Sequence, residues 1–333
     1  MRESKSVIIG VSGTELTADE RAFYAEHQPW GFILFARNVE SPDQLRRLTG
    51  DLREAVGRDA IITIDQEGGR VQRMRAPHWA EWAPPLEDAE RGPAAMRLRY
   101  RLIGQELRAV GLDSNCAPTL DIASDATHPF LQNRCLGRNV ADVAARGRAV
   151  AEGLLDAGVV PIMKHMPGHG RAVADSHHET PVVTTPHAEL SQTDFAAFRA
   201  LNDLPMGMSA HIRFADLDQA PATSSPRMIG IIRDEIGFDG LLMTDDISMN
   251  GLQGTIGERS AASITAGIDL ILHCHGHMSE MEEVVANAGP MTADARRRAD
   301  RALSFRRAPD AVPAADLLAQ YRALGGQVDW AQA

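Results

Sequence analysis

The chain has 333 residues, of which 44% are hydrophobic and 24% are charged, and its formal net charge is −11. This composition is ordinary for a globular enzyme with a sizeable apolar core. The negative charge argues against nucleic-acid binding, which needs a basic surface. It also argues against docking on anionic membranes.

Cysteine usage and the N-terminal residues predict the compartment. The three cysteines, Cys116, Cys135 and Cys274, are far apart and form no CxxC pair, which favours reduced thiols over disulfides. Residues 1–6 are charged and lead directly into an apolar run, without a secretory signal. No apolar run approaches the roughly 20 residues needed to span a bilayer. We therefore expect a cytoplasmic protein that does not associate with membranes.

Eight short apolar runs recur along the chain. Continuously apolar runs of this length are typical of strands buried on both faces of a parallel sheet. The runs cover residues 7–11, 31–35, 60–64, 112–118, 159–164, 205–211, 241–244 and 269–273.

The segments between the runs have helical spacing. We expect helices over residues 41–56, 93–110, 140–157, 189–202 and 226–236. The first begins with Ser41 and Pro42, a cap followed by proline in the first turn. Residues 291–333 have charged helical character without a further strand, and Arg296 to Arg298 are interpreted as a solvated face rather than a phosphate site.

Eight strands with helical crossovers predict the α/β class and a (β/α)₈ barrel of the TIM type. A doubly wound open sheet is the alternative, but it usually has fewer strands, and no glycine fingerprint for a dinucleotide follows the first run. We predict that residues 1–333 form a single catalytic domain with a C-terminal helical segment from about residue 291.

Polar residues collect at the C-terminal ends of five runs, which is where barrel enzymes place their active sites. Asp245 follows the seventh run, and a carboxylate on such a rigid element can act as a nucleophile. Alternatively, Asp245 or Asp246 caps the next turn. Adjacent strand residues point in opposite directions, so we expect only one of the two to face the pocket.

Residues 168–177 have the composition of a loop over the site. Asp175 and His177 are two positions apart, and an aspartate beside a histidine can orient the imidazole and favour its protonated form. Such a ring can give a proton to a leaving oxygen and later take one from water. Taken alone, an Asp-x-His pair is more often an ordinary surface hydrogen bond.

Two other groups of residues could bind a sugar or a metal ion. Asp65, Arg73 and Arg134 could hold sugar hydroxyls, or they could form salt bridges and caps at the barrel rim. The twelve histidines suggest zinc. However, the chain has no His-Glu-x-x-His pattern, and Lys164 beside His165 would repel a metal ion. We predict no metal site and no cofactor.

Three motifs together resemble family 3 glycoside hydrolases of the β-N-acetylhexosaminidase branch. They are Asp65 to Arg73, then Lys164 to Gly170 followed by Asp175-Ser176-His177, and then Gly237 to Met249. The resemblance extends from about the first strand to the eighth. One departure is Met166, which stands where the family usually has phenylalanine.

The resemblance implies a retaining mechanism through a covalent glycosyl-enzyme intermediate. It places the nucleophile on Asp245 and the acid/base on His177, with Asp175 as its partner. The sugar-binding residues that it implies are Asp65, Arg73, Lys164, His165 and a further arginine, for which Arg134 fits best and Arg138 competes.

The function implied is exo-hydrolysis of terminal β-linked N-acetylglucosamine from peptidoglycan fragments (muropeptides) during cell-wall recycling. We expect a monomer that acts on a small saccharide without nucleic-acid or membrane partners. The alternatives are a barrel β-glucosidase, a non-catalytic sugar-binding or metal-dependent protein on this scaffold, and a glycoside phosphorylase. Phosphorolysis is considered because an imidazole base, unlike a carboxylate, does not repel phosphate.

Overall fold

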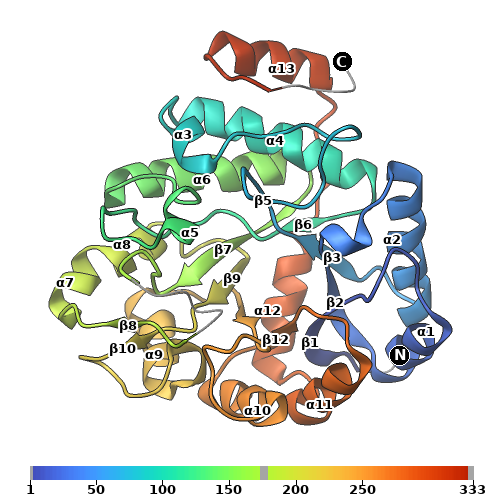
Figure 1. Ribbon diagram of the computed structural model, residues 1–333, viewed down its shortest axis with the longest axis vertical. Helices are drawn as coiled ribbons and strands as arrows, with labels where there is room; N and C mark the ends of the chain where they lie inside the picture. The colour runs from blue at the N-terminus through green and yellow to red at the C-terminus, as the bar shows by residue number, and fades with distance from the viewer. Residues whose placement is uncertain (1–2, 173–178, 329–333) are drawn as a thin grey trace.

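The computed structural model describes residues 3–172 and 179–328. Parallel strands close into a barrel in the order β1-β12-β11-β9-β7-β6-β3-β2, which confirms the predicted fold class (Figure 1). Each of the eight predicted runs contributes one of these strands. They are β1 (Lys5–Gly10), β2 (Pro29–Leu34), β3 (Ile61–Ile64), β6 (Ser114–Asn115), β7 (Val160–Met166), β9 (Met206–Ser209), β11 (Leu241–Asp246) and β12 (Leu270–His273).

The strands are apolar on both faces because each face packs on a different layer. On β1, Ile8 belongs to a buried cluster formed by alternate residues of the other barrel strands, including Ile61 and Leu241. Its neighbours Val7 and Ile9 belong to the larger cluster shared with the helices. Alternation of side chains along a strand therefore fills the barrel interior and the outer layer at once.

Helices surround the barrel (Figure 1). Ser41 caps the second helix through a 3.3 Å hydrogen bond from Gln44 N, and Pro42 stands at its first position, as predicted. The helices of this layer are α1 (Ala18–His27), α2 (Pro42–Val56), α4 (Pro93–Ala109), α6 (Val140–Asp156), α7 (His187–Gln192), α8 (Asp194–Arg199), α9 (Pro226–Gly230), α10 (Ile256–Ala266) and α11 (Met278–Ala288).

The expected continuous helix over residues 189–202 is wrong. Two short helices, α7 and α8, meet at Thr193, whose backbone angles of −119° and −91° are not helical. The break directs Asp194 into the interior, where its carboxylate lies 2.7 Å from Arg171 Nε. By contrast, the helix predicted over 226–236 is confirmed: α9 continues directly into a π-helical turn, Ile231–Glu235.

The C-terminal segment from about residue 291 forms α12 (Ala293–Leu303) and α13 (Ala314–Ala323). Figure 1 shows α13 lying along α4. The arginine run lies on α12, where Arg297 and Arg298 pair with Asp239 at 2.9 Å and Arg298 also pairs with Asp269 at 3.0 Å.

Shorter elements lie in the segments that connect the barrel strands and the surrounding helices. They are β4 (Gln66–Gly68), β5 (Val71–Gln72), α3 (Pro85–Ala89), α5 (Pro129–Gln132), β8 (Val182–Val183) and β10 (Arg213–Phe214). Within the described ranges, no helix is long and apolar enough to cross a membrane.

Candidate functional site

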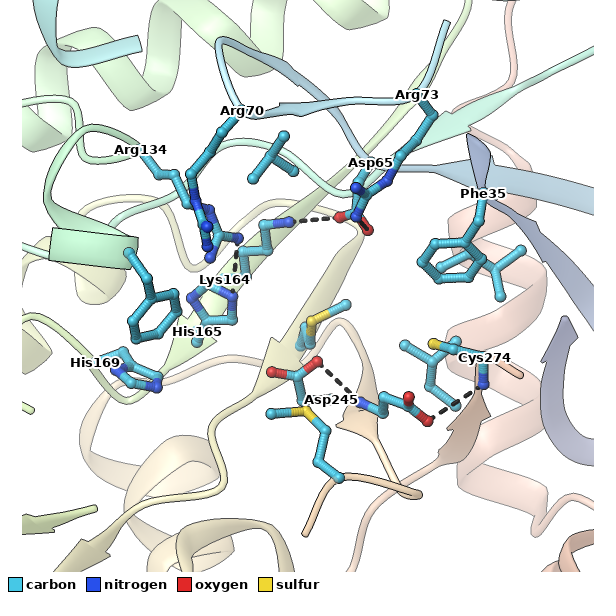
Figure 2. A pocket seen from close by; sticks show the side chains of 17 residues that line it. Phe35, Asp65, Arg70, Arg73, Arg134, Lys164, His165, His169, Asp245 and Cys274 are labelled. Atoms are coloured by element: carbon cyan, nitrogen blue, oxygen red, sulfur yellow. Dashed lines mark hydrogen bonds and ion pairs between the residues drawn. The ribbon is translucent and has the colours of Figure 1, made fainter. Parts of the chain in front are cut away.

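A cavity of about 270 Å³ lies at the C-terminal ends of the barrel strands (Figure 2). Six of the eight candidate residues from the sequence line it. They are Asp65, Arg73, Arg134, Lys164, His165 and Asp245. The other two, Asp175 and His177, lie outside the described residues.

Asp65 follows β3 and is held by two cations. Lys164 Nζ lies 2.7 Å from Asp65 Oδ1, and Arg73 Nη2 lies 3.2 Å from Asp65 Oδ2. Burial by itself would raise the pKa of Asp65, but the charges of Lys164 and Arg73 hold it well below its usual value. Asp65 is therefore an anion that faces the cavity, not a cap for its own loop.

A tight hairpin between β4 and β5 brings Arg73 back to Asp65. Its turn uses Gly68, whose φ of +110° disfavours other residues, and a Cβ there would lie only 2.7 Å from the Ala83 carbonyl oxygen. Gln66 Oε1 accepts a 2.9 Å hydrogen bond from Arg73 N, which fixes the returning strand. The glycines of this motif are thus required by the backbone that positions the arginine.

Glu67 was not identified as a site residue from the sequence. Its carboxylate accepts hydrogen bonds from Arg134 Nε at 2.9 Å and Nη2 at 2.8 Å, and Lys164 Nζ lies 2.6 Å from Oε1. Burial alone would raise the pKa of Glu67, but Arg134 and Lys164 lower it to about 2. The spacing of Glu67 from Asp65 could have identified it from the sequence, because residues two positions apart lie on the same side of an extended segment.

Arg134 and Arg138, the two candidates for the further sugar-binding arginine, lie in different surroundings. Arg134 lines the cavity, and its side chain is 10% exposed. Arg138 is 53% exposed and pairs with the fully exposed Asp125 at 3.0 Å. Of the two, only Arg134 contacts the cavity.

His165 is oriented by Asp121, a second residue that the sequence reasoning missed. Asp121 Oδ2 lies 2.7 Å from His165 Nδ1, and Oδ1 accepts a 2.6 Å hydrogen bond from His169 N. Burial would raise the pKa of Asp121, but the neighbouring His165 lowers it. An ionised carboxylate only accepts, so Nδ1 carries the proton, and Nε2 lies 3.5 Å from Arg134 Nη2. The signal for Asp121 was its place just after the fourth run.

Asp245 projects into the cavity from the end of β11 (Figure 2). Its Oδ1 accepts a 2.8 Å hydrogen bond from Asp246 N. Burial would raise its pKa, but the positive fields of His165 and His211, together with this hydrogen bond, hold the pKa below the ordinary value. Asp245 therefore presents an ionised carboxylate opposite Lys164 and His165.

Asp246, the second carboxylate of the doublet, also lines the cavity. The β11 register shifts relative to β12 between Met243 and Asp246, which interrupts strict alternation. Their roles nevertheless differ. The Asp246 carboxylate accepts hydrogen bonds from Ser248 Oγ at 2.7 Å and Cys274 N at 3.2 Å, so Asp246 closes the local turn.

Comparisons with known proteins show the family of the chain. The sequence profile of the glycosyl hydrolase family 3 N-terminal domain matches residues 5–304. A β-hexosaminidase from Bordetella avium is 37% identical over 81% of this chain and 80% of its own length. A β-hexosaminidase from Methylococcus capsulatus is 38% identical over 79% of this chain and 80% of its own length.

Solved structures give the same result. NagZ from Neisseria gonorrhoeae, in complex with N-trifluoroacetyl-D-glucosamine, has a TM-score of 0.83 at 27% identity and covers 97% of this chain and 96% of that chain. A family 3 β-N-acetylglucosaminidase from Paenibacillus has a TM-score of 0.81 at 30% identity, and this chain covers only 62% of it. The chain therefore belongs to glycosyl hydrolase family 3 and is a glycoside hydrolase built on a TIM-type barrel.

Proposed function

We propose that the protein is a retaining exo-β-N-acetylhexosaminidase that removes terminal β-linked N-acetylglucosamine. The observation that carries this proposal is the ionised carboxylate of Asp245 facing Lys164 and His165 across a cavity of about 270 Å³. A cavity of this size suits a single sugar ring, as an exo-acting enzyme requires.

Asp245 is the proposed nucleophile. Its carboxylate forms a bond to the anomeric carbon while the bond to the aglycone oxygen breaks, giving a covalent glycosyl-enzyme intermediate. The lowered pKa of Asp245 keeps it ionised at neutral pH. Asp246 is less suited to this role because hydrogen bonds from Ser248 and Cys274 hold its carboxylate.

The charged wall opposite Asp245 is the proposed sugar-binding surface. Asp65 accepts hydrogen bonds from sugar hydroxyls, and Arg73, Arg134 and Lys164 donate to hydroxyl and carbonyl oxygens. His165 lines the same wall. These side chains are held by one another and by Glu67, so little ordering remains when the sugar binds.

His177, oriented by Asp175, is the proposed general acid and base. It gives a proton to the departing aglycone oxygen, and the neutral ring then takes a proton from the water that attacks the intermediate. The attack releases Asp245 and keeps the configuration at the anomeric carbon. The family motif and the proximity of Gly168 to Gly170 to the cavity residue His165 support this role.

The proposed natural substrates are muropeptides that carry terminal N-acetylglucosamine, degraded in the cytoplasm during cell-wall recycling. The resemblance of the motifs supports this assignment. The N-acylated glucosamine that the Neisseria gonorrhoeae NagZ binds also supports it.

The decisive experiment is to trap the intermediate with a fluorinated N-acetylglucosaminyl donor and to map the label by mass spectrometry. We expect the label on Asp245, and Asp245→Ala is expected to abolish turnover of an aryl N-acetyl-β-glucosaminide. A label on Asp246, or near-normal turnover by Asp245→Ala, would overturn the assignment. Faster cleavage of an aryl β-glucoside than of the N-acetylated substrate would reject the proposed sugar specificity.

A further inference from the structure

Three histidines surround one carboxylate at the end of β12, outside the cavity. His273 Nε2 lies 2.8 Å from Glu280 Oε2, and His275 Nδ1 lies 3.3 Å from the same oxygen. His277 Nδ1 lies 3.5 Å from the other oxygen, Glu280 Oε1. Neither the sugar-binding wall nor the proposed acid/base loop uses these residues.

The spacing of three of these groups fits a transition-metal ion. The ligand atoms of His273, His275 and Glu280 all lie within 4.8 Å of one another. In a tetrahedral zinc site with bonds of about 2.0–2.1 Å, neighbouring ligand atoms are roughly 3.4 Å apart. Small side-chain rotations are therefore enough to place the three atoms around one ion.

The backbone holds two of the ligands in place. His273 is the last residue of β12 and is completely buried, and Glu280 lies in the first turn of α11. His275 and Glu280 are 47% and 27% exposed, so solvent reaches the group from one side. Rigid elements on both sides of an open position are typical of a site that keeps a water ligand.

The ligand atoms that His273, His275 and Glu280 offer favour some cations over others. Two imidazoles and one carboxylate suit zinc, whereas calcium and magnesium prefer oxygen ligands.

We propose that His273 Nε2, His275 Nδ1 and the Glu280 carboxylate bind one Zn²⁺ ion, with water as the fourth ligand. This inference is independent of the proposed glycosidase chemistry and departs from the sequence-based expectation of no metal site. The sequence pattern search missed it because Glu280 lies on a helix, five positions after His275.

The position of the ion defines its effect. It joins the loop after β12 to α11, and that loop also donates the Cys274 N hydrogen bond to Asp246. His273, His275 and Glu280 do not line the sugar cavity. The ion therefore stabilises the fold at this edge of the barrel and takes no part in the reaction.

The test uses the full chain after removal of metals with a chelator. Calorimetric titration with ZnCl₂ is expected to show a site at His273, His275 and Glu280, and Co²⁺ is expected to give the intense visible absorption of a tetrahedral complex. Zinc at about one hundred times its Kd is expected to raise Tm by roughly 5 °C. Glu280→Gln should weaken zinc binding at this site at least about 100-fold and remove the Tm increase.

Two control variants test whether zinc binds at this site. His277→Asn changes the 68% exposed neighbour and is expected to change zinc affinity less than about threefold. His177→Asn removes the histidine of the proposed acid/base loop and should leave the zinc site intact.

Glu280→Gln is expected to fold and to turn over an aryl glycoside normally without zinc. The proposal is overturned if Glu280→Gln binds zinc as tightly and in the same amount as the wild type. It is also overturned if zinc binding is absent in the wild type or is lost only in His177→Asn.

Discussion

Glu67 and Arg134 form two parallel hydrogen bonds, Nε to Oε2 at 2.9 Å and Nη2 to Oε1 at 2.8 Å, behind the wall of the cavity. Both side chains are buried, and Lys164 shares the Oε1 atom. One carboxylate thus fixes two cations that come from different parts of the chain. This arrangement places both cations at the cavity without requiring a bound sugar to order them.

Glu67→Gln is expected to lower both stability and activity. Neutralising a buried carboxylate leaves Arg134 and Lys164 incompletely compensated, so the free energy of unfolding should fall by about 3 kcal/mol. Mispositioned cations should lower kcat/KM by about 100-fold, equivalent to about 2.7 kcal/mol. Urea denaturation and kinetics with an aryl N-acetyl-β-glucosaminide measure the two effects.

Glu81→Gln is the matched control for this prediction. Glu81 pairs with Arg75 at 2.7 Å, but both side chains are more than 40% exposed. Exposed pairs contribute up to about 1 kcal/mol, so this variant should lose much less stability. Equal losses in the two variants would contradict the importance of the buried pair.

Arg134→Ala and Arg138→Ala test which arginine contacts the sugar. Loss of a charged hydrogen-bond donor in the cavity should lower kcat/KM by about 100-fold for Arg134→Ala. Arg138→Ala should change kcat/KM less than about twofold, because its exposed pair with Asp125 lies outside the cavity. A larger effect at Arg138 would show that the family arginine had been assigned to the wrong position.

Asp121→Asn tests the orientation of His165. The amide can accept or donate, so it no longer fixes the proton on His165 Nδ1. We expect a loss of at least about 10-fold in kcat/KM, with Tm changing by a few degrees. The proton NMR signal of the Nδ1–H group reports orientation directly. An unchanged signal in the variant would rule out Asp121 as the positioning residue.

Glu106→Gln tests a buried carboxyl away from the site. Burial raises the pKa of Glu106 to about 7 from an ordinary 4.5, despite hydrogen bonds from Ala80 N and Trp82 Nε1. The folded protein therefore binds this proton more tightly than the unfolded chain. Stability is lost as pH rises from about 4.5 to 7, by up to about 3 kcal/mol.

The upward direction of the Glu106 pKa shift determines the expected result. Glutamine cannot ionise, so Glu106→Gln should be more stable than the wild type at pH 8. At pH 4.5, where Glu106 is protonated in the folded protein, the two should be similar. Thermal unfolding at both pH values measures this difference. A stability difference that does not change between the two pH values would contradict the raised pKa.

The regular part of the fold was predictable from local patterns. Runs such as residues 31–35 are apolar on both faces, which is typical of parallel strands covered on both sides, and the presence of eight such runs favoured a barrel over an open sheet. The break at Thr193 was not predictable, because the ion pair between Asp194 and Arg171 that favours it joins residues 23 positions apart.

The sequence by itself determined the barrel and the identity of the polar residues at its C-terminal edge, because strand ends follow from the hydrophobic pattern. Only the tertiary structure decided the partners of those residues. Glu67 and Asp65 both act on Lys164, which is 97 and 99 positions away from them. Contacts of this kind depend on closing the barrel, and no local spacing encodes them.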